Sequence, residues 1–336
     1  MPSVLKTLTC LLALLLASGG AWAQDRVTLI TSGFDKAIYL PARLAMQLGY
    51  FTEQGLDVSL QAEVAGAYAE DALLVGAAQG VIGAYDHTID LQARGKAVQS
   101  VVQLTVSPGQ AALVPAALAD QVRSPADFKG RRIGVTALGS STSFLMQYLG
   151  ELHGVKPSAY TLVPVGSGPA FMKALRGQRV DVGMNTEPTA SHLLASGEAR
   201  LLVDLRTPQA TLAALGGGYP SACLYMQAAW VNGHRDLVQK LVNALVKSLR
   251  FIQTHNAAEI VARMPPDESP DDRVAYLHVL ESSRAMYSPD GLMPEDGPPM
   301  VLKVQTVVNR PVRERRIDLG KTYTNAFALA VPAASP

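Results

Sequence analysis

Residues 26–60 read RVTLITSGFDKAIYLPARLAMQLGYFTEQGLDVSL, and this stretch indicates the fold class. Its two ends, residues 26–31 and 56–60, are short runs rich in Val, Leu, Ile and Thr, which favour strands. Between them, Leu40, Leu44 and Leu48 recur at helical spacing. A strand, a helix and a second strand in this order predict a parallel strand pair with a crossover helix. We therefore expect an α/β protein.

The alternation of strand-like and helical segments continues to about residue 226. Pro108-Gly109 and Pro115 interrupt it once, and the pattern then restarts with little residue identity. Further strands are expected at 80–84, 98–106, 131–135, 160–165, 180–184, 200–204 and 222–226, and helices at 68–77, 87–93, 141–152, 170–176 and 188–195. This rhythm predicts two Rossmann-like lobes with largely parallel sheets. The expected boundaries are 24–107 for the first part of lobe I, 108–216 for lobe II and 217–336 for the return to lobe I.

The chain becomes mainly helical after residues 216–218, which are all glycine. Residues 232–255 place apolar side chains on one helical stripe, and Asn232 can cap their first turn. Two more helices are expected at 271–286 and 298–308. These extra C-terminal helices have no sheet of their own, so we expect them to pack on the first lobe.

Residues 1–23 have the three parts of a Sec-type signal peptide. Lys6 supplies a positive charge, residues 8–17 form an apolar run, and Ala21-Trp22-Ala23 is a cleavage motif. The run is too short to span a bilayer, which needs about 20 apolar residues. Cys10 could carry a lipid anchor, but it precedes most of the apolar run. We expect an exported, soluble mature protein.

The composition excludes several classes of protein. The chain has 29 Lys and Arg against 28 Asp and Glu, and residues 24–336, which lack Lys6, have 28 of each. This balance lacks the basic footprint of nucleic-acid-binding proteins. A hydrophobic content of 48% excludes intrinsic disorder. Cys223 is the only cysteine after residue 23, so neither an internal disulfide nor a structural zinc site is expected.

The loops that follow the strands are the expected place for a ligand, because open α/β sheets bind ligands at the carboxyl ends of their strands. Six such loops lead into predicted helix N-termini, whose free N–H groups suit an anion. They and the second crossover contain the candidate ligand contacts Phe34, Lys36, Tyr39, Tyr68, Tyr85, Asp86, His87, Gly139, Ser140, Ser141, Thr142, Ser167, Asn185, Glu187 and Tyr219.

Each candidate also has a structural interpretation. Residues 139–142, with three hydroxyls in a row, could be a helix cap, as could Asp86. Glu187-Pro188 could be a plain helix start. The aromatic candidates could equally belong to the core. A direct relay from Asp86 to His87 is not expected, because adjacent residues at a helix start point in different directions.

The charges of these loops do not identify the ligand. Lys36 is their only cation, whereas Asp35, Asp86 and Glu187 would repel an anion if they were uncompensated. A polar aromatic acid, a zwitterion such as taurine, or an amino-pyrimidine would use both kinds of charge. The loops do not choose among them.

Several motifs resemble one protein family. They are Tyr39-Leu-Pro-Ala, Gly49-Tyr-Phe, Gly55-Leu-Asp-Val, Leu73-Leu-Val-Gly, Ser124-Pro-Ala-Asp-Phe-Lys-Gly-Arg-Arg-Ile-Gly-Val, Gly139-Ser-Ser-Thr and Ala174-Leu-Arg-Gly-Gln-Arg-Val-Asp-Val followed by Glu187-Pro188. From about residue 27 to 330 the chain resembles periplasmic solute-binding proteins of ABC importers, of the nitrate, sulfonate and taurine type, which are related to thiamine-pyrimidine-binding proteins. The resemblance implies a type II periplasmic binding protein fold, with two lobes joined by two crossover segments and a ligand between them. It also places the counterpart of Glu187 at the cleft.

The function implied by this resemblance is capture of a small organic solute, namely a sulfonate, a taurine-like compound or an aromatic acid. Delivery would be to an ABC permease in the inner membrane, by a periplasmic monomer without cofactor or catalysis. The lobes would close by hinge motion near residues 106–112 and 205–220. The alternatives are a pyrimidine-binding protein and a ligand sensor docking on a membrane receptor. Enzymes of this fold that use a cysteine-rich motif and iron fit poorly, and no G-x-S-x-G elbow is present.

Overall fold

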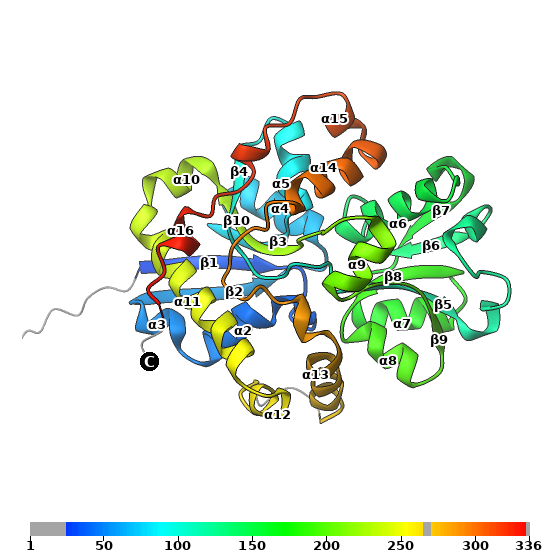
Figure 1. The fold of residues 1–336 in the computed structure, drawn as a ribbon, viewed down its shortest axis with the longest axis horizontal. Coiled ribbons are helices and arrows are strands. Elements are labelled where there is room, and N and C mark those ends of the chain that lie inside the picture. Colours follow the sequence, from blue (N-terminus) through cyan, green and yellow to red (C-terminus); the bar gives the residue numbers. More distant parts are fainter. Residues whose placement is uncertain (1–24, 265–269, 334–336) are drawn as a thin grey trace, which may run out of the picture.

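The structure is a computed structural model that describes residues 25–264 and 270–333. It contains two five-stranded sheets, with strand orders β2-β1-β3-β10-β4 and β7-β6-β8-β5-β9. Each sheet forms the centre of one lobe, and the lobes lie side by side (Figure 1). Two lobes of this kind confirm the expected α/β architecture. The predicted signal peptide, residues 1–23, lies outside the described residues.

The first lobe is built on residues that precede and follow the second lobe in sequence. Its strands are β1 (Asp25–Thr31), β2 (Leu56–Ala62), β3 (Gly80–Ala84), β4 (Val98–Gln103) and β10 (Ala222–Gln227). Its covering helices are α2 (Leu40–Gln47), α3 (Tyr50–Glu53), α4 (Gly66–Leu74) and α5 (Asp86–Ala93). β1 is parallel to β2 and β3, with Leu29 opposite both Leu60 and Gly80. The strand–helix–strand pattern predicted for residues 26–60 therefore forms this parallel unit.

The second lobe has the same order of strands. They are β5 (Gln110–Pro115), β6 (Arg132–Val135), β7 (Thr161–Pro164), β8 (Val182–Thr186) and β9 (Ala199–Leu205). The helices are α6 (Ser141–Leu152), α7 (Gly168–Arg176), α8 (Thr189–Ala195) and α9 (Pro208–Leu215). The turn before β6 is capped, since the Ser124 hydroxyl accepts from the Ala126 amide and Asp127 accepts from the Ser124 amide.

Each sheet contains one strand that enters from the other lobe, and that strand is antiparallel. β10 pairs antiparallel with β3 and β4, and β5 pairs antiparallel with β8 and β9. The sheets are therefore mixed rather than largely parallel. β5 was not expected, because Pro108-Gly109 and Pro115 read as a break. Gly109 makes the turn at φ +61°, and Pro115 is the last residue of the buried strand.

The chain after β10 is helical and covers more than the first lobe. It contains α10 (Ala228–Gly233), α11 (Arg235–Thr254), α12 (Ala257–Val261), α13 (Pro270–Ser283), α14 (Gly297–Val308), α15 (Arg310–Arg313) and α16 (Ala326–Leu329). α11 packs on α2 with its predicted apolar stripe. Asn232 lies inside α10, and the residue that precedes α11 is His234, so the predicted cap is wrong.

Two C-terminal helices also contact the second lobe, which corrects the expectation that they pack on the first lobe alone. α14 lies against both α5 and α6, and α13 contacts α8 (Figure 1). Val301 and Val304 of α14 belong to the same buried cluster as Leu145 and Leu149 of α6. The reason is that α14 has apolar side chains that neither lobe covers alone. The two lobes thus share one hydrophobic cluster.

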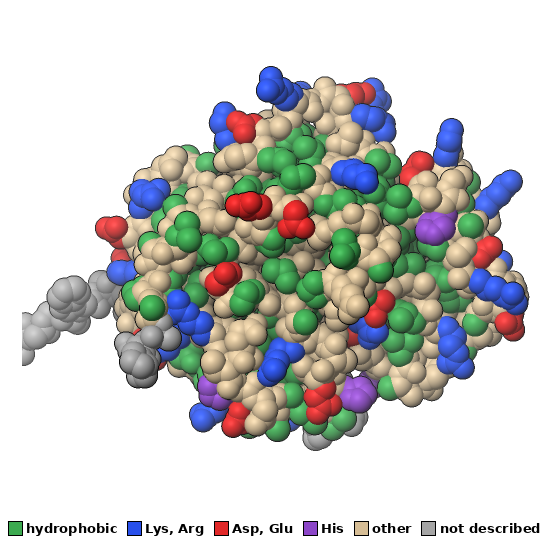
Figure 2. All heavy atoms as spheres, in the orientation of Figure 1, with side chains coloured by type: hydrophobic (Ala, Val, Ile, Leu, Met, Phe, Trp, Pro, Cys, Tyr) green, Lys and Arg blue, Asp and Glu red, His purple; other side chains and the backbone are tan. Residues whose placement is uncertain are grey.

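The described surface is mixed in charge. On the face shown in Figure 2, Lys and Arg side chains are dispersed among Asp and Glu side chains rather than gathered in one patch. Cys223 is a buried free thiol on β10, and burial raises its pKa to about 12. No helix within residues 25–264 and 270–333 is long and apolar enough to cross a membrane.

Candidate functional site

A small cavity lies between the lobes at the carboxyl ends of β1, β3, β6 and β8. Its lining consists of Ser32, Lys36, Ile38, Tyr39, Gly66, Ala84 and His87 from the first lobe and Gln110, Thr136, Ser140, Ser141, Thr142 and Thr186 from the second. Each lobe therefore supplies about half of the wall.

The cavity is nearly closed. It offers about 30 Å³ to the centres of water-sized spheres, and one water needs about 10–15 Å³ by that measure. The Ala37 amide donates to the Glu187 carbonyl at 2.9 Å and so joins the lobes beside the cavity. In this arrangement of the lobes the cavity has room for no more than a few waters.

Lys36 places a buried ammonium group at the cavity wall. Its Nζ donates to the Ser32 hydroxyl at 3.1 Å, and that hydroxyl lies 2.6 Å from the Tyr39 hydroxyl. Burial lowers the pKa of Lys36 to about 8, although the negative charge of Asp35 opposes the shift. At neutral pH the side chain is therefore still mainly cationic. No ion pair between Lys36 and a carboxylate occurs in the described structure, so this charge remains available to an anionic group.

His87 lines the cavity at the start of α5, and the buried Asp86 precedes it without lining the cavity itself. The Glu70 carboxylate of α4 lies 2.9 Å from His87 Nδ1, and Tyr219 donates to Asp86 Oδ2 at 2.8 Å. Burial lowers the pKa of His87, but the charge and hydrogen bond of Glu70 and the charge of Asp86 outweigh it and raise that pKa to about 9. Burial raises the pKa of Asp86 against the opposing effect of His87. Asp86 Oδ1 and His87 Nε2 are 3.7 Å apart, which is too long for the hydrogen bond that a direct relay between them needs.

Four buried polar atoms without a hydrogen-bond partner in the described structure belong to three residues that line the cavity and to Asp86, which precedes one of them. They are Asp86 Oδ1 and His87 Nε2 in the first lobe, and Gln110 Oε1 and Thr186 Oγ1 in the second. Buried polar groups in folded proteins nearly always have partners. Their concentration at one cavity indicates a place where a polar ligand supplies the missing hydrogen bonds.

The hydroxyls after β6 have divided roles. Those of Thr136, Ser140 and Thr142 lie 2.8–3.0 Å from one another, and Ser140 also caps α6. Ser141 is outside this triangle, and Gln110 Nε2 lies 3.5 Å from its hydroxyl. Of the three consecutive hydroxyls, those of Ser140 and Thr142 therefore support the loop, whereas that of Ser141 lies at the cavity beside Gln110.

Glu187 does not line the cavity, and its carboxylate has other partners. Its carboxylate is fully buried, accepts from the Ser191 amide and hydroxyl at 2.9 and 2.8 Å, and pairs with Arg206 at 2.9 Å. Glu187 is thus compensated, by an arginine that follows β9 and lies outside the six loops. The peptide bond to Pro188 is cis.

Other predicted contacts also lie away from the cavity lining. Tyr85 is in the core, fully buried just before α5, with its hydroxyl 2.5 Å from that of Thr322. Asn185 is buried and accepts from the Thr186 amide. Phe34 and Tyr68 are about half exposed. Gly139 lines a separate groove, Ser167 precedes α7, and Tyr219 lies behind Asp86.

Lys36, Tyr39, His87, Ser140, Ser141 and Thr142 are the predicted residues that the structure brings together at the cavity. Sequence reasoning did not single out Ser32, Ile38, Gly66, Ala84, Gln110, Thr136 and Thr186. Their shared signal is position, since most of them end a strand or follow it directly. Gln110 begins the strand that was read as a break. No group of three or more His, Cys, Asp or Glu side chains is placed to hold a metal ion anywhere in the described residues.

Solved structures with the same two-lobed fold include periplasmic binding proteins. A protein from Bordetella bronchiseptica RB50 is 33% identical over 91% of this chain and 96% of its own, with a TM-score of 0.85. The periplasmic nitrate-binding protein of Synechocystis PCC 6803 is 13% identical over 92% and 90%, with a TM-score of 0.72. The alkanesulfonate-binding protein of Xanthomonas axonopodis pv. citri is 21% identical over 84% and 90%, with a TM-score of 0.63. These likenesses confirm the expected periplasmic binding protein fold.

Curated relatives carry a different description. A 4-amino-5-hydroxymethyl-2-methylpyrimidine phosphate synthase of Saccharomyces cerevisiae is 28% identical over 49% of this chain, and one of Aspergillus parasiticus is 26% identical over 80%. The chain spans about half the length of the yeast relatives, at 47%. The family model described as NMT1/THI5 like matches residues 37–258, which is most of the chain. This protein therefore belongs to the NMT1/THI5-like family.

Proposed function

We propose that the chain is the solute-binding component of an ABC importer, which closes its two lobes on one small organic molecule and presents it to a membrane permease. The observation that carries this proposal is the interlobe cavity with unpartnered polar atoms on both sides, His87 Nε2 in the first lobe and Gln110 Oε1 and Thr186 Oγ1 in the second. A ligand that bonds to both sides stabilises the closed form, which is the requirement for a clamp. The binding-protein fold of the neighbours supports it.

The polarity of the cavity selects a ligand with both donor and acceptor groups. Lys36 Nζ and a protonated His87 call for an acceptor, preferably an anionic one, whereas Asp86 Oδ1 calls for a donor. A taurine-like zwitterion carries a sulfonate and an ammonium group and meets both demands. A plain sulfonate or an aromatic acid meets only the first. The proposed ligand is therefore a small amino-bearing anion of the sulfonate class.

An amino-pyrimidine is the second candidate, on one observation. His87 Nε2 and Asp86 Oδ1 present a donor and an acceptor 3.7 Å apart. A ring nitrogen beside an exocyclic amino group can match such a pair. The names of the curated relatives also refer to a pyrimidine, and they are names of enzymes. Recovery of every bound compound unchanged, tested by mass spectrometry after long incubation, separates binding from turnover.

Paired ligands test the proposal. Calorimetry and thermal shift would compare taurine with ethanesulfonate, which lacks the ammonium group, and an aminopyrimidine with the methylpyrimidine that lacks its amino group. We expect saturable binding of an amino-bearing member and at least about tenfold weaker binding of its partner, the discrimination typical of a lost charged hydrogen bond. Equal binding within both pairs would contradict a role for Asp86, and silence across these and nitrate would contradict solute binding of this class.

The partner and the location belong to the same proposal. An importer requires export of the chain across the inner membrane and a permease with its ATPase. Genes for such a pair beside this one would support transport, whereas a receptor gene in their place would support ligand sensing. Cell fractionation and light scattering would check the proposed periplasmic location and monomeric state.

A further inference from the structure

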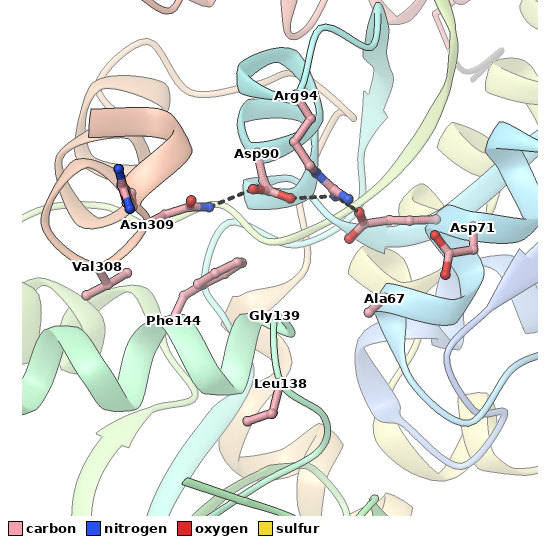
Figure 3. A pocket seen from close by; sticks show the side chains of 11 residues that line it. Ala67, Asp71, Asp90, Arg94, Leu138, Gly139, Phe144, Val308 and Asn309 are labelled. Carbon is pink, nitrogen blue, oxygen red and sulfur yellow. Dashed lines mark hydrogen bonds and ion pairs between the residues drawn. The ribbon is translucent and has the colours of Figure 1, made fainter. Parts of the chain in front are cut away.

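A chain of charged side chains leads from an exposed interlobe groove to the ligand cavity. The groove encloses about 400 Å³ between α4, α5, the loop before α6 and the junction of α14 and α15 (Figure 3). Asn309 donates to Asp90 at 2.7 Å, Arg94 pairs with both Asp90 and Glu70 at 2.5 Å, and the second oxygen of Glu70 lies 2.9 Å from His87 Nδ1. Figure 3 shows the Arg94 side chain beside that of Asp90 at the edge of the groove.

Glu70 is the buried member of this chain that contacts His87 directly. Its side chain is only 4% exposed, whereas that of Arg94 is 42% exposed. One carboxylate oxygen is engaged by Arg94 and the other by His87. A carboxylate that accepts a hydrogen bond from Nδ1 keeps a proton on that nitrogen. The cavity-facing nitrogen, Nε2, then also bears a proton only while the ring is positively charged.

We propose that Glu70 is a positioning residue for ligand recognition, which holds the His87 ring in one orientation and keeps its Nε2 as a hydrogen-bond donor toward the cavity. The inference deepens the proposed function and rests on it only where a ligand is concerned. Glu70 touches no ligand itself, since His87 lies between it and the cavity. The acceptor specificity of the cavity is thereby set from outside it.

All charged and titratable neighbours of the ring are consistent with this role. Glu70 faces it from α4, and Tyr225 faces it from β10 with its hydroxyl 3.4 Å from Nδ1. On its own helix, Asp86 lies 3.7 Å from Nε2, and Asp90 adds a more distant negative charge. The neighbours that shift the His87 pKa are all negative, and together they raise it to about 9 in spite of burial.

The first experiment needs no ligand. Nitrogen NMR of the imidazole would follow the titration of His87 in the wild type, in Glu70→Gln and in Asp71→Asn, which removes one charge from the exposed next position of the same helix. We expect Glu70→Gln to lower the His87 titration midpoint by at least about one pH unit, and Asp71→Asn to leave it nearly unchanged. Glu70→Asp, which keeps the charge but shortens the side chain, should give a smaller drop and serves if Glu70→Gln does not fold. Equal midpoints in the wild type and all three variants would overturn the inference.

The second experiment tests whether the protonation state of the His87 ring controls ligand binding. With the compound that binds the wild type, affinity for Glu70→Gln should fall at least about twofold at pH 8, as a midpoint lowered by one pH unit requires, and recover toward the wild-type value at pH 5.5, where the lowered midpoint matters less. A loss that is the same at both pH values would show a merely structural role and overturn the recognition part. If no compound binds the wild type, the proposed function fails while the NMR comparison still decides the role of Glu70.

Discussion

The backbone amide of Ala37 donates a 2.9 Å hydrogen bond to the carbonyl oxygen of Glu187, and this bond ties the first lobe to the second beside the ligand cavity. The Glu187 side chain turns away from the cavity and is held by Arg206 and Ser191. One residue thus anchors α8 with its carboxylate and offers its carbonyl to the other lobe. We infer that Glu187 acts on the clamp through structure rather than by touching the ligand.

Replacement of Glu187 tests this division. Glu187→Gln removes the fully buried one of the two carboxylates that pair with Arg206, and Asp204 remains beside the guanidinium. The loss of stability should therefore stay below the about 3 kcal/mol that a fully unpaired buried charge costs. Urea unfolding should show that loss. Glu198→Gln, which breaks a more exposed arginine pair, should show a much smaller one. If Glu187→Gln instead kept its stability and lost ligand, the carboxylate would be a ligand contact after all.

Lys36 should destabilise the free protein at neutral pH. Because burial lowers its pKa from 10.5 to about 8, the folded state holds fewer protons than the unfolded state between these pH values. Stability contributed by this group therefore rises from pH 8 to 10.5, and below pH 8 the native state bears a cost of about 3 kcal/mol. Lys36→Met should raise the urea midpoint at pH 7 and abolish the rise above pH 8.

The ligand should respond to Lys36→Met in the opposite sense. Removing the buried ammonium group takes away the partner of an anionic group, so affinity for an anionic ligand should fall by at least about tenfold. Arg26→Met, at an exposed site on β1, is the control and should change neither quantity appreciably. A Lys36→Met protein that is both less stable and equally tight in binding would contradict the proposed role.

The fold was largely predictable because local periodicity carries it. The βαβ unit of residues 26–60 and most later strands and helices lie where the pattern placed them. β5 was not predicted, because the prolines and the glycine at its ends are also typical loop residues. Only its pairing with β8 and β9 makes it a strand. The position of α14 between the lobes was not predicted either, because it depends on contacts with α6, which is distant in sequence.

The site was predictable only in part. Lys36, His87 and Ser141 follow strand ends, and strand ends of an α/β sheet meet at one place. The partners that set their chemistry come from elsewhere. Glu70 reaches His87 from another helix, α4, and Arg206 reaches Glu187 across 19 residues of sequence. Side-chain pairing at this range depends on the packed lobes, and no local pattern encodes it.

Gly66 should be required for the position of the His87 ring. A Cβ atom at residue 66 would lie 2.4 Å from His87 Cε1, whereas at Gly233 it would meet nothing within 4 Å. Gly66→Ala must therefore displace the imidazole, and overpacking of this kind costs about 1–3 kcal/mol. We expect weaker ligand binding by calorimetry, with Gly233→Ala unchanged. Full affinity in Gly66→Ala would mean that the ring is not held where the ligand needs it.

Ser140 and Ser141 should separate stability from binding, although they are adjacent. The Ser140 hydroxyl caps α6 and bonds to Thr136 and Thr142, so Ser140→Ala should cost about 1 kcal/mol of unfolding free energy. Ser141 takes no part in that triangle, and its hydroxyl lies at the cavity near Gln110. Ser141→Ala should therefore unfold at nearly the wild-type urea concentration and bind the ligand more weakly. The same loss of stability in both variants would show that Ser141 belongs to the cap, and unchanged affinity in Ser141→Ala would remove it from the site.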